Sequence, residues 1–496
     1  MIRPMPITRI QLEEVEFMNE GKMLIGNQWI DPVGGETIPV INPSTGEPFS
    51  KIGRGREADI DCAVKAAQGA LDDEWGRLSA LDRGRLLLKT SELIRQHFHE
   101  LAGIEAQDTG KTRTQAEVDV NVAARYFEYY GGLAGKLDGY SIPFQPGFQA
   151  FTIREPYGVT GHIIPWNYPA QMFARDTSAA LATGNAMILK PAEDACLSTL
   201  RMAELMIEVG LPKGALNIVT GYGPEAGAAL SRHPGVEHLS FTGSPEVGTL
   251  IQIEMARRNR GCTMELGGKS PQIVFADADL EKAVGPIVTS IVMSAGQTCS
   301  AGSRLLVEEA AYDNIVGLVS DAFSKVRVGT PDMNLECGPV ISAKQRQRVQ
   351  GFIDQAKSDG IPILAEGTIA ENVPSGGFFV RPALFGPVPP SNAIACKEIF
   401  GPLLSVIPFK DEADAVRLAN ATEYGLVAYI WTRDGGRQLR MAKAVKCGQV
   451  YINGTGFGGN VELPFGGVKK SGFGREKGLA AMDEYSTLKT ILIHHG

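Results

Sequence analysis

Two side chains 34 positions apart have the types needed for covalent chemistry at a carbonyl carbon. Cys299 lies in the polar stretch 295–300, and Glu265 lies in the stretch 264–269, directly before Leu266 and a pair of glycines. A thiolate can add to an aldehyde carbonyl, and a separate carboxylate can activate the water that cleaves the resulting thioester. A hydride must leave between these steps, so the pair predicts a nicotinamide cofactor as its acceptor.

Cys299 differs from the other cysteines of this chain because Gly296 and Gly302 bracket it within a polar turn. We expect this turn to open a helix, whose dipole would stabilise the thiolate. The other six cysteines lack such a setting and are interpreted as structural. The seven histidines include no recognisable nucleophile–base pair and no metal-binding spacing, which leaves Glu265 as the candidate base. Taken alone, Glu265 could equally be a solvated residue beside a glycine turn.

Asn167 follows the apolar stretch 159–164 and stands between Pro165 and Pro169. Its side-chain amide and the backbone N–H of Cys299 could donate to the oxyanion that forms when a thiolate attacks an aldehyde. The alternative is that Asn167 shapes the turn between the two prolines.

The helix predicted after Pro169 places Tyr168, Met172 and Arg175 on one face, because these residues are spaced four and three positions apart. If that face lines the substrate site, Arg175 could bind a substrate carboxylate. An arginine paired with a structural carboxylate is at least as good an interpretation.

The sequence offers two glycine-containing turns for the phosphates of a dinucleotide. Gly223 and Gly227 belong to a GxGxxxG run that is one residue longer than the usual fingerprint, and its alternative is a plain tight turn. The stretch 241–248 is the better candidate. There Gly243 permits a turn, and Ser244 can cap a helix whose first N–H groups bind pyrophosphate.

Glu193 follows the predicted strand 186–190, a position from which a carboxylate commonly accepts a hydrogen bond from a ribose 2′-hydroxyl. Such a carboxylate would repel the 2′-phosphate of NADP, so we expect NAD to be preferred over NADP. The alternative is a carboxylate placed favourably in the first turn of a helix.

Around these residues the chain alternates between predicted helices and strands. Apolar spacing of three and four residues predicts helices over 58–71, 82–99, 115–130 and 197–209. The alternation after residue 158 predicts a doubly wound parallel sheet with ligands at the carboxyl ends of its strands. The predicted strands are 159–164, 186–190, 216–220, 238–242 and 272–275, followed in a second α/β region by 303–307, 404–408 and 427–431. Short alternating stretches at 137–155 and 487–493 predict an arm of strands.

Composition excludes several classes of protein. A length of 496 residues suggests two or three domains, and 44% hydrophobic with 21% charged residues is typical of a globular α/β enzyme. The net charge of −8 and the lack of basic runs argue against nucleic acid as a partner. No stretch reaches the roughly 20 apolar residues of a membrane span, and the odd, scattered cysteines indicate a reducing compartment. No secretory signal is evident, so we expect a cytoplasmic protein.

Together these stretches resemble the signatures of the NAD(P)-dependent aldehyde dehydrogenases of the non-phosphorylating, hydrolytic type, from about residue 20 to the C-terminus. The resemblance implies an α/β fold with a doubly wound parallel sheet for NAD, a second α/β catalytic domain and a small β oligomerisation arm. It implies a small-molecule aldehyde as substrate and a homotetramer or homodimer. The expected boundaries are 1–136 and 156–267 for the NAD-binding domain, 268–467 for the catalytic domain, and 137–155 and 480–496 for the arm.

The resemblance also implies roles for individual residues. Cys299 would be the nucleophile, Glu265 the base and Asn167 the oxyanion donor, with no metal ion. From the stretch 397–402, Glu398 would bind the nicotinamide ribose and Phe400 would pack near the ring. The implied cofactor residues are Ile163, Pro165, Trp166, Lys190, Glu193, Gly223, Gly227, Phe241, Gly243, Ser244, Leu266, Glu398 and Phe400, and the implied substrate residues are Tyr168, Met172, Arg175 and Phe465.

Two positions depart from the family pattern and leave the aldehyde open. Arg175 and Asp176 stand where many members that act on apolar aldehydes have an aromatic residue and a lysine. An equivalent arginine binds the substrate carboxylate in semialdehyde dehydrogenases of the family. However, Met293 stands where succinate-semialdehyde enzymes have a second arginine.

Three kinds of function therefore compete. CoA-acylating members of the family lack the glutamate found here as Glu265, and non-catalytic descendants usually lose the nucleophile. We therefore expect NAD-dependent oxidation of an aldehyde to a carboxylic acid, with a carboxylate-bearing semialdehyde as one candidate substrate.

Overall fold

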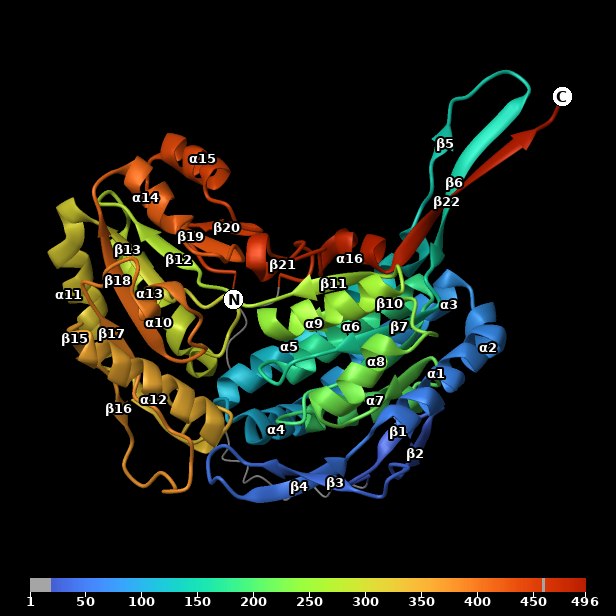
Figure 1. Ribbon diagram of the computed structural model, residues 1–496, viewed down its shortest axis with the longest axis horizontal. Helices are drawn as coiled ribbons and strands as arrows, with labels where there is room; N and C mark the ends of the chain where they lie inside the picture. The colour runs from blue at the N-terminus through green and yellow to red at the C-terminus, as the bar shows by residue number, and fades with distance from the viewer. Residues whose placement is uncertain (1–18, 457–459) are drawn as a thin grey trace.

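The computed structural model describes residues 19–456 and 460–496. Figure 1 shows this part of the chain as two helix-covered sheets lying side by side, with an arm of strands projecting away from them. The N-terminal and middle parts of the chain build the first sheet, and the yellow-to-orange part builds the second.

The first sheet has the strand order β2-β1-β9-β8-β7-β10-β11-β21, in which β7 to β11 are mutually parallel and the outer pairings at both edges are antiparallel. The chain starts its parallel strands at β7, adds β8 and β9 on one side, and then crosses back to add β10 and β11 on the other. The strands are β1 (Met23–Ile25), β2 (Gln28–Ile30), β7 (Val159–Ile163), β8 (Ala186–Lys190), β9 (Leu216–Ile218), β10 (His238–Thr242), β11 (Gly261–Glu265) and β21 (Gly472–Phe473).

Helices cover both faces of this sheet, which explains why its central strands are buried along their whole length. Every residue of β7, β8 and β10 is buried. Helices α5 and α6 pack against each other, while α8 packs against α1 and α9. These helices are α1 (Glu57–Asp72), α2 (Glu74–Arg77), α3 (Ala80–Gln96), α4 (Phe98–Thr109), α5 (Arg113–Leu133), α6 (Pro169–Thr183), α7 (Leu197–Glu208), α8 (Ala228–Arg232) and α9 (Pro245–Arg257).

The second sheet has the order β15-β17-β18-β13-β12-β19-β20 and is parallel except for its edge strand β15. It encloses a hydrophobic core separate from that of the first sheet. Its strands are β12 (Pro271–Val274), β13 (Arg304–Glu308), β15 (Ile363–Glu366), β17 (Ala383–Phe385), β18 (Leu403–Phe409), β19 (Val427–Trp431) and β20 (Gln449–Ile452). Its helices are α10 (Leu280–Val292), α11 (Tyr312–Phe323), α12 (Ala343–Ser358), α13 (Ala393–Cys396), α14 (Glu412–Ala419) and α15 (Gly435–Ala444).

The arm is a small sheet of order β22-β6-β5, in which the C-terminal strand pairs with a strand from the middle of the chain. Its strands are β5 (Ser141–Ile142), β6 (Phe148–Pro156) and β22 (Ser486–His494). Residues 480–484 lie in α16 (Gly478–Glu484), which packs on α6, so the arm strand begins later than the expected boundary of 480. Short pairs β3 (Thr37–Ile41) with β4 (Pro48–Gly53) and β14 (Arg327–Val328) with β16 (Thr368–Ile369) complete the sheets.

The α/β fold class expected from the sequence is confirmed by this arrangement. One expected helix differs: the stretch 82–99 divides at His97 into α3 and α4, because the backbone of His97 leaves the helical region there. No helix within residues 19–456 and 460–496 is long and apolar enough to span a membrane.

Candidate active site

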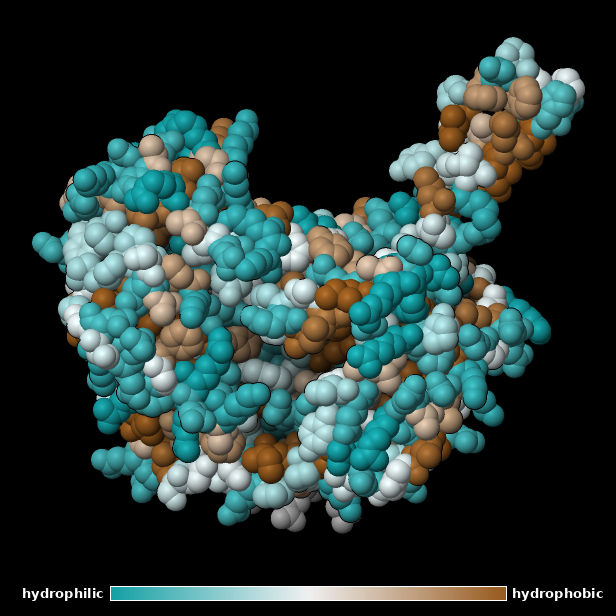
Figure 2. Space-filling view, viewed as in Figure 1, coloured by the Kyte–Doolittle hydropathy of each residue, from teal (hydrophilic) through white to brown (hydrophobic). Residues whose placement is uncertain are grey.

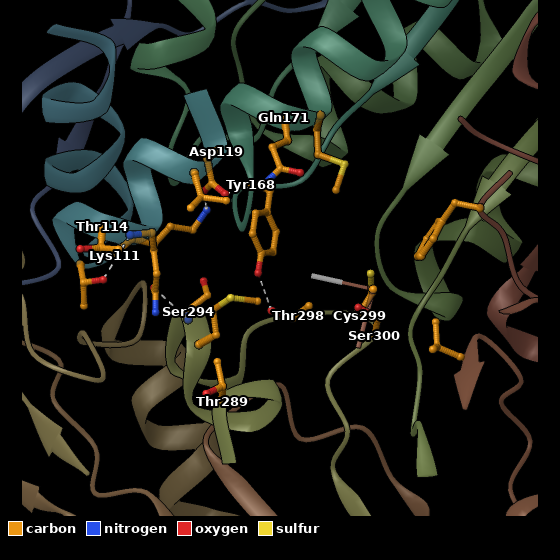
Figure 3. Close-up of a pocket in the computed structure, with 18 of the residues that line it drawn as sticks. Lys111, Thr114, Asp119, Tyr168, Gln171, Thr289, Ser294, Thr298, Cys299 and Ser300 are labelled. Atoms are coloured by element: carbon orange, nitrogen blue, oxygen red, sulfur yellow. Dashed lines mark hydrogen bonds and ion pairs between the residues drawn. The ribbon is translucent and has the colours of Figure 1, made fainter. Parts of the chain in front are cut away.

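A cavity of about 570 Å³ between the two domains contains Cys299 on its wall. Figure 3 shows Tyr168 and Gln171, from the start of α6, reaching into the cavity from one side, with Cys299 and Ser300 further along it. The substrate candidates Tyr168, Met172, Arg175 and Phe465 all line this cavity. The structure therefore brings all four next to the same space as the thiol.

Cys299 lies in a loop between α10 and β13, and the expected helix after it does not form. That expectation is wrong because the chain turns directly into β13. Ser294 and Ala295 adopt positive φ angles of 52° and 53°, and Gly296 one of 73°. A Cβ on Gly296 would lie 2.3 Å from the backbone of Gly401, so only glycine fits this turn.

Side-chain hydrogen bonds hold the Cys299 loop in the absence of a helix. Asn167 donates from Nδ2 to the Gln297 carbonyl at 2.8 Å, and the Gln297 side chain accepts from the Ile341 N–H at 2.9 Å. The hydroxyls of Tyr168 and Thr298 lie 2.8 Å apart, as the dashed line in Figure 3 shows. The residue predicted to bind the oxyanion thus also fixes the turn, and its second Nδ2 hydrogen remains for a ligand.

The surroundings of Cys299 keep the thiol protonated. Desolvation by the protein and, to a smaller extent, the carboxyls of Glu265 and Glu398 raise its pKa to about 12, while Arg175 and Lys477 act in the opposite direction. The helix dipole that the sequence predicted is missing. The thiol therefore needs a neighbouring base to become a nucleophile.

Glu265 is the carboxyl best placed to be that base. It ends β11, is 3% exposed, and neither of its oxygens has a hydrogen-bond partner within the described residues. Burial raises the pKa of this carboxyl well above its usual range, with Arg175 opposing the shift. A buried carboxyl without a partner is costly, and such costs are concentrated where a group must exchange a proton.

The dinucleotide candidates gather at the carboxyl ends of the first sheet. The strand order reverses between β7 and β10, and ligands of doubly wound sheets bind in the crevice formed at such a point. Ile163 ends β7, Lys190 ends β8, and Gly243 directly follows β10. Pro165, Trp166, Phe241 and Leu266 belong to the same strand ends or to the turns that follow them.

The turn after β10 has the features of a phosphate cradle. Ser244 caps α9 by accepting from the Val247 N–H at 3.3 Å, and Pro245 occupies the first turn. A Cβ on Gly243 would lie 2.4 Å from the Phe241 ring, so a larger residue here would force that ring to move. Exposed first-turn N–H groups of a helix bind anions.

The other glycine run also precedes a helix. Gly223 and Gly227 bound a π-helical turn that leads into α8. Gly227 is buried, and a Cβ there would lie 3.7 Å from the Ile163 side chain. Gly227 thus lies near the end of β7 as well.

Lys190 and Glu193 form a pair with 2.7 Å between Nζ and Oε2. Lys190 is almost fully buried, whereas the Glu193 side chain is 28% exposed and can still accept hydrogen bonds. Their place after β8 agrees with the position expected for a ribose-binding carboxylate.

The second domain contributes Glu398 and Phe400 to the crevice. Glu398 accepts from the Gly268 N–H at 2.9 Å, and burial raises its pKa to about 7. A Cβ on Gly267 would lie 2.1 Å from the Glu398 carboxylate, so the glycine pair after Glu265 is what admits this side chain. The Phe400 ring lies 5.3 Å from the Trp166 ring in an edge-to-face contact. The donors, acceptors and open cradles of both domains therefore fit a dinucleotide.

Arg175 faces the cavity but already has partners. Its Nε lies 3.1 Å from Asp176 and 3.8 Å from Glu476, and its Nη2 donates to the Thr242 hydroxyl at 2.7 Å. It is 2% exposed. These contacts favour the interpretation of Arg175 as part of a buried ion network over its interpretation as a free substrate clamp.

Residues that the sequence did not single out also shape the cavity. Lys111 is fully buried, is ion-paired with Glu105 and Asp119, and lies 3.8 Å from the centre of the Tyr168 ring. Lys477 lines the cavity next to Phe465. Lys111 follows Gly110 at the end of α4, and neither lysine carries a motif that would mark it. No group of three or more histidine, cysteine or acidic residues within the described ranges could hold a metal ion.

Comparison with known proteins gives one consistent answer. The sequence model of the aldehyde dehydrogenase family matches residues 29–491. Human retinal dehydrogenase 2 is 41% identical over 477 residues, covering 95% of this chain and 91% of that protein. The rat mitochondrial aldehyde dehydrogenase is 41% identical over 483 residues, covering 96% of this chain and 92% of that protein.

Solved structures agree in fold. A Burkholderia cenocepacia protein with a provisional assignment as an aldehyde dehydrogenase is 55% identical, with a TM-score of 0.95 over 96% of this chain and 100% of that one. The NAD⁺ complex of an aldehyde dehydrogenase from Bacillus cereus is 38% identical, with a TM-score of 0.93 over 96% and 97% of the two chains. The chain belongs to the aldehyde dehydrogenase family. It is an oxidoreductase that uses NAD to oxidise an aldehyde.

The ion network of Arg175 gives the first prediction. Arg175→Leu leaves Asp176 and Glu476 buried without their cation, so we expect the free energy of unfolding to fall by about 3–5 kcal/mol. Arg440→Leu is the control, because it removes an exposed pair with Glu412 that contributes about 1 kcal/mol at most. Urea unfolding measures both. An unchanged unfolding midpoint, with loss of activity confined to carboxylate-bearing aldehydes, would show instead that Arg175 binds substrate.

Proposed function

We propose that this enzyme oxidises its aldehyde through a thiohemiacetal on Cys299 and hydrolyses the resulting thioester with the help of Glu265. The observation that carries this proposal is the pairing of a protonated, enclosed thiol with a buried carboxyl whose oxygens have no partner among the described residues. The charge of Glu265 raises the pKa of the Cys299 thiol, which requires the two groups to be close.

Proton transfers at named atoms connect the steps. Glu265 takes the proton from the Cys299 Sγ, and the thiolate then forms a bond to the aldehyde carbon. The oxyanion that results accepts hydrogen bonds from the Asn167 Nδ2 and the Cys299 backbone N–H. NAD, when bound, accepts the hydride from this carbon. Glu265 then releases the thiol proton to solvent and takes a proton from water, whose hydroxide adds to the thioester carbon. The C–S bond breaks to release the acid, and the Glu265 carboxyl returns its proton to the Cys299 thiolate.

Glu265 also bears on which acceptor receives the acyl group. A CoA-acylating enzyme must keep water away from the thioester, whereas a mobile carboxyl base beside glycines can activate water. Glu265 precedes the Gly267–Gly268 pair, and β11 leaves its side chain without a fixed partner within the described residues. We therefore infer that water is the acceptor. Intact Cys299 and Glu265 likewise favour an active enzyme over a non-catalytic descendant.

For the cofactor, we propose that Ser244 and the first turn of α9 bind the pyrophosphate, with Gly223 and Gly227 lining the same crevice. Lys190 and Glu193 would bind the adenosine ribose. Glu398 would bind the nicotinamide ribose, and Trp166 and Phe400 would enclose the ring. A carboxylate at Glu193 favours NAD over NADP.

We further propose that the chain assembles into a homodimer or homotetramer through the arm. Apolar side chains on the arm strands and the turn between them are exposed, and Figure 2 shows them gathered on the projecting arm. An exposed strand edge and an apolar surface of this kind favour pairing with another chain. The residues are Tyr140, Ile142, Phe144, Leu488, Leu492 and Ile493. The seven free cysteines support a reducing compartment, for which we propose the cytoplasm.

The roles of Cys299 in thiol attack and of Glu265 in thioester hydrolysis can be separated kinetically. Glu265→Gln should slow hydrolysis of the thioester more than thiol attack, so a burst of NADH should precede a steady state lowered by about 10²–10⁴-fold. Stopped-flow absorbance measures both phases. Cys299→Ala is the control and should show neither phase while still binding NAD. Undiminished steady-state turnover in Glu265→Gln would refute the base role.

Cofactor choice provides an independent prediction. Glu193→Gln removes the charge that repels a 2′-phosphate, so the ratio of kcat/KM for NAD over NADP should fall about ten- to a hundredfold. Glu208→Gln is the matched control because this residue lies at the far end of α7, the helix that follows Glu193. Steady-state kinetics with both cofactors measure the ratio. An unchanged ratio would remove Glu193 from the ribose site.

A further inference from the structure

Three cationic side chains line the cavity that contains Cys299, and they differ in how they are neutralised. Lys111 is paired with Glu105 and Asp119. Arg175 is paired with Asp176 and Glu476. The ammonium of Lys477 has no ion pair or hydrogen bond to any residue within 19–456 and 460–496. It makes a cation–π contact with the Phe465 ring, whose centre lies 4.8 Å from the ammonium.

The backbone holds Lys477 in this place. Its φ of 64° is in the left-handed region, which a lysine rarely adopts without support from its neighbours. Glu476, on one side, accepts from the Ser240 hydroxyl at 2.9 Å, and Gly478, on the other, donates to the Val461 carbonyl at 2.8 Å. The lysine is thus presented at the cavity wall by two anchored neighbours.

The ammonium is still charged at neutral pH although the protein surrounds it. Burial and the nearby Arg175 lower the pKa of Lys477 to about 8, while Cys299, Glu265 and Glu476 act against this shift. The charge of Lys477 in turn lowers the pKa of Cys299. A desolvated cation that lacks a counter-charge attracts an anion strongly, since little water competes for it.

The remaining wall of the cavity indicates which part of a ligand would lie between such an anion and the Cys299 thiol. Its wall includes the apolar side chains of Met172, Val427 and Phe465 and the ring of Tyr429. An aldehyde with a short apolar chain and a terminal carboxylate would place its carbonyl at the thiol, its chain against the apolar wall and its carboxylate at the ammonium. An uncharged aldehyde would leave the ammonium unpaired.

We propose that Lys477 binds the carboxylate of the substrate, so that the site selects aldehydes that carry an anionic group. The inference rests on the proposed function, since it names the substrate class of the same site. It assigns to Lys477 the carboxylate contact for which the sequence offered Arg175.

Succinic semialdehyde and butanal test the proposal, because they share a four-carbon chain and differ in a carboxylate in place of a methyl group. The measured quantity is the ratio of kcat/KM for the acid over that for butanal. Lys477→Met should lower this ratio about ten- to a hundredfold, as expected for loss of a charge-assisted contact. Lys477→Arg should keep most of the preference. Lys282→Met, which removes a charge from the exposed surface of α10, should leave the ratio unchanged.

The same ratio followed against pH is a second readout. In the wild type it should decline as pH rises through about 8, because Lys477 then loses its proton. Arg175, Cys299, Glu265 and Glu476 also act on this lysine, but effects on thiol attack and hydrolysis are shared by both aldehydes and cancel in the ratio. In Lys477→Arg the decline should disappear, since arginine stays charged.

The outcomes separate the two proposals. If the wild type forms no NADH from either aldehyde and Cys299→Ala behaves identically, the proposed function fails. If the wild type oxidises both and Lys477→Met leaves the ratio unchanged, the inference is overturned. Equal losses on both aldehydes would also overturn it and would show that Lys477 acts on Cys299 or Glu265. If Lys477→Met does not fold, Lys477→Gln carries the same test.

Discussion

Desolvation of two acidic groups side by side is the constraint on which the rest of this site depends. Cys299 and Glu265 are both held away from water, and burial raises the pKa of each. A neutral thiol is a poor nucleophile, so attack by Cys299 is faster when a neighbouring base takes its proton. A raised pKa makes the Glu265 carboxylate a stronger base. It can take the thiol proton, release it to solvent, and then take a proton from water.

Holding such a pair requires support from outside it. Asn167 and Gln297 fix a loop that no helix stabilises. Gly267 lets Glu398 of the second domain approach closely, and Gly296 lets the loop pass close to the backbone of Gly401. Arg175 opposes the burial of Glu265 electrostatically while it neutralises Asp176 and Glu476. Buried ion networks contribute little net stability but fix geometry when every member is paired. Within the described residues Lys477 is the cation of this cavity left outside such a network, which is why its charge is available to a ligand.

Much of the fold could be predicted because short stretches rich in apolar residues alternate with helical patterns along the chain. The strands 186–190, 238–242 and 427–431 were expected with the bounds that β8, β10 and β19 have. The strand ends then placed Lys190, Gly243 and Glu265 at one edge of the sheet.

The remaining features depend on tertiary contacts that local pattern does not encode. The loop at Cys299 has the polar composition of a helix start, but positive φ angles at Ser294 and Ala295 turn it into β13. The ion partners of Arg175 come from α6 and from the segment after β21, so spacing alone could not separate a structural arginine from a substrate-binding one. Lys477 reaches the cavity because its backbone has a positive φ angle, which the local sequence does not predict.

The central claim is that Cys299 carries the acyl group before Glu265 helps water remove it, and peptide mass spectrometry after an acid quench tests this directly. Glu265→Gln mixed with NAD and an aldehyde, then quenched during the first turnover, should yield a peptide containing Cys299 heavier by the acyl group. The six other cysteines should be unmodified. An unmodified Cys299 peptide during active NADH formation, or an acyl group on a different cysteine, would contradict the account.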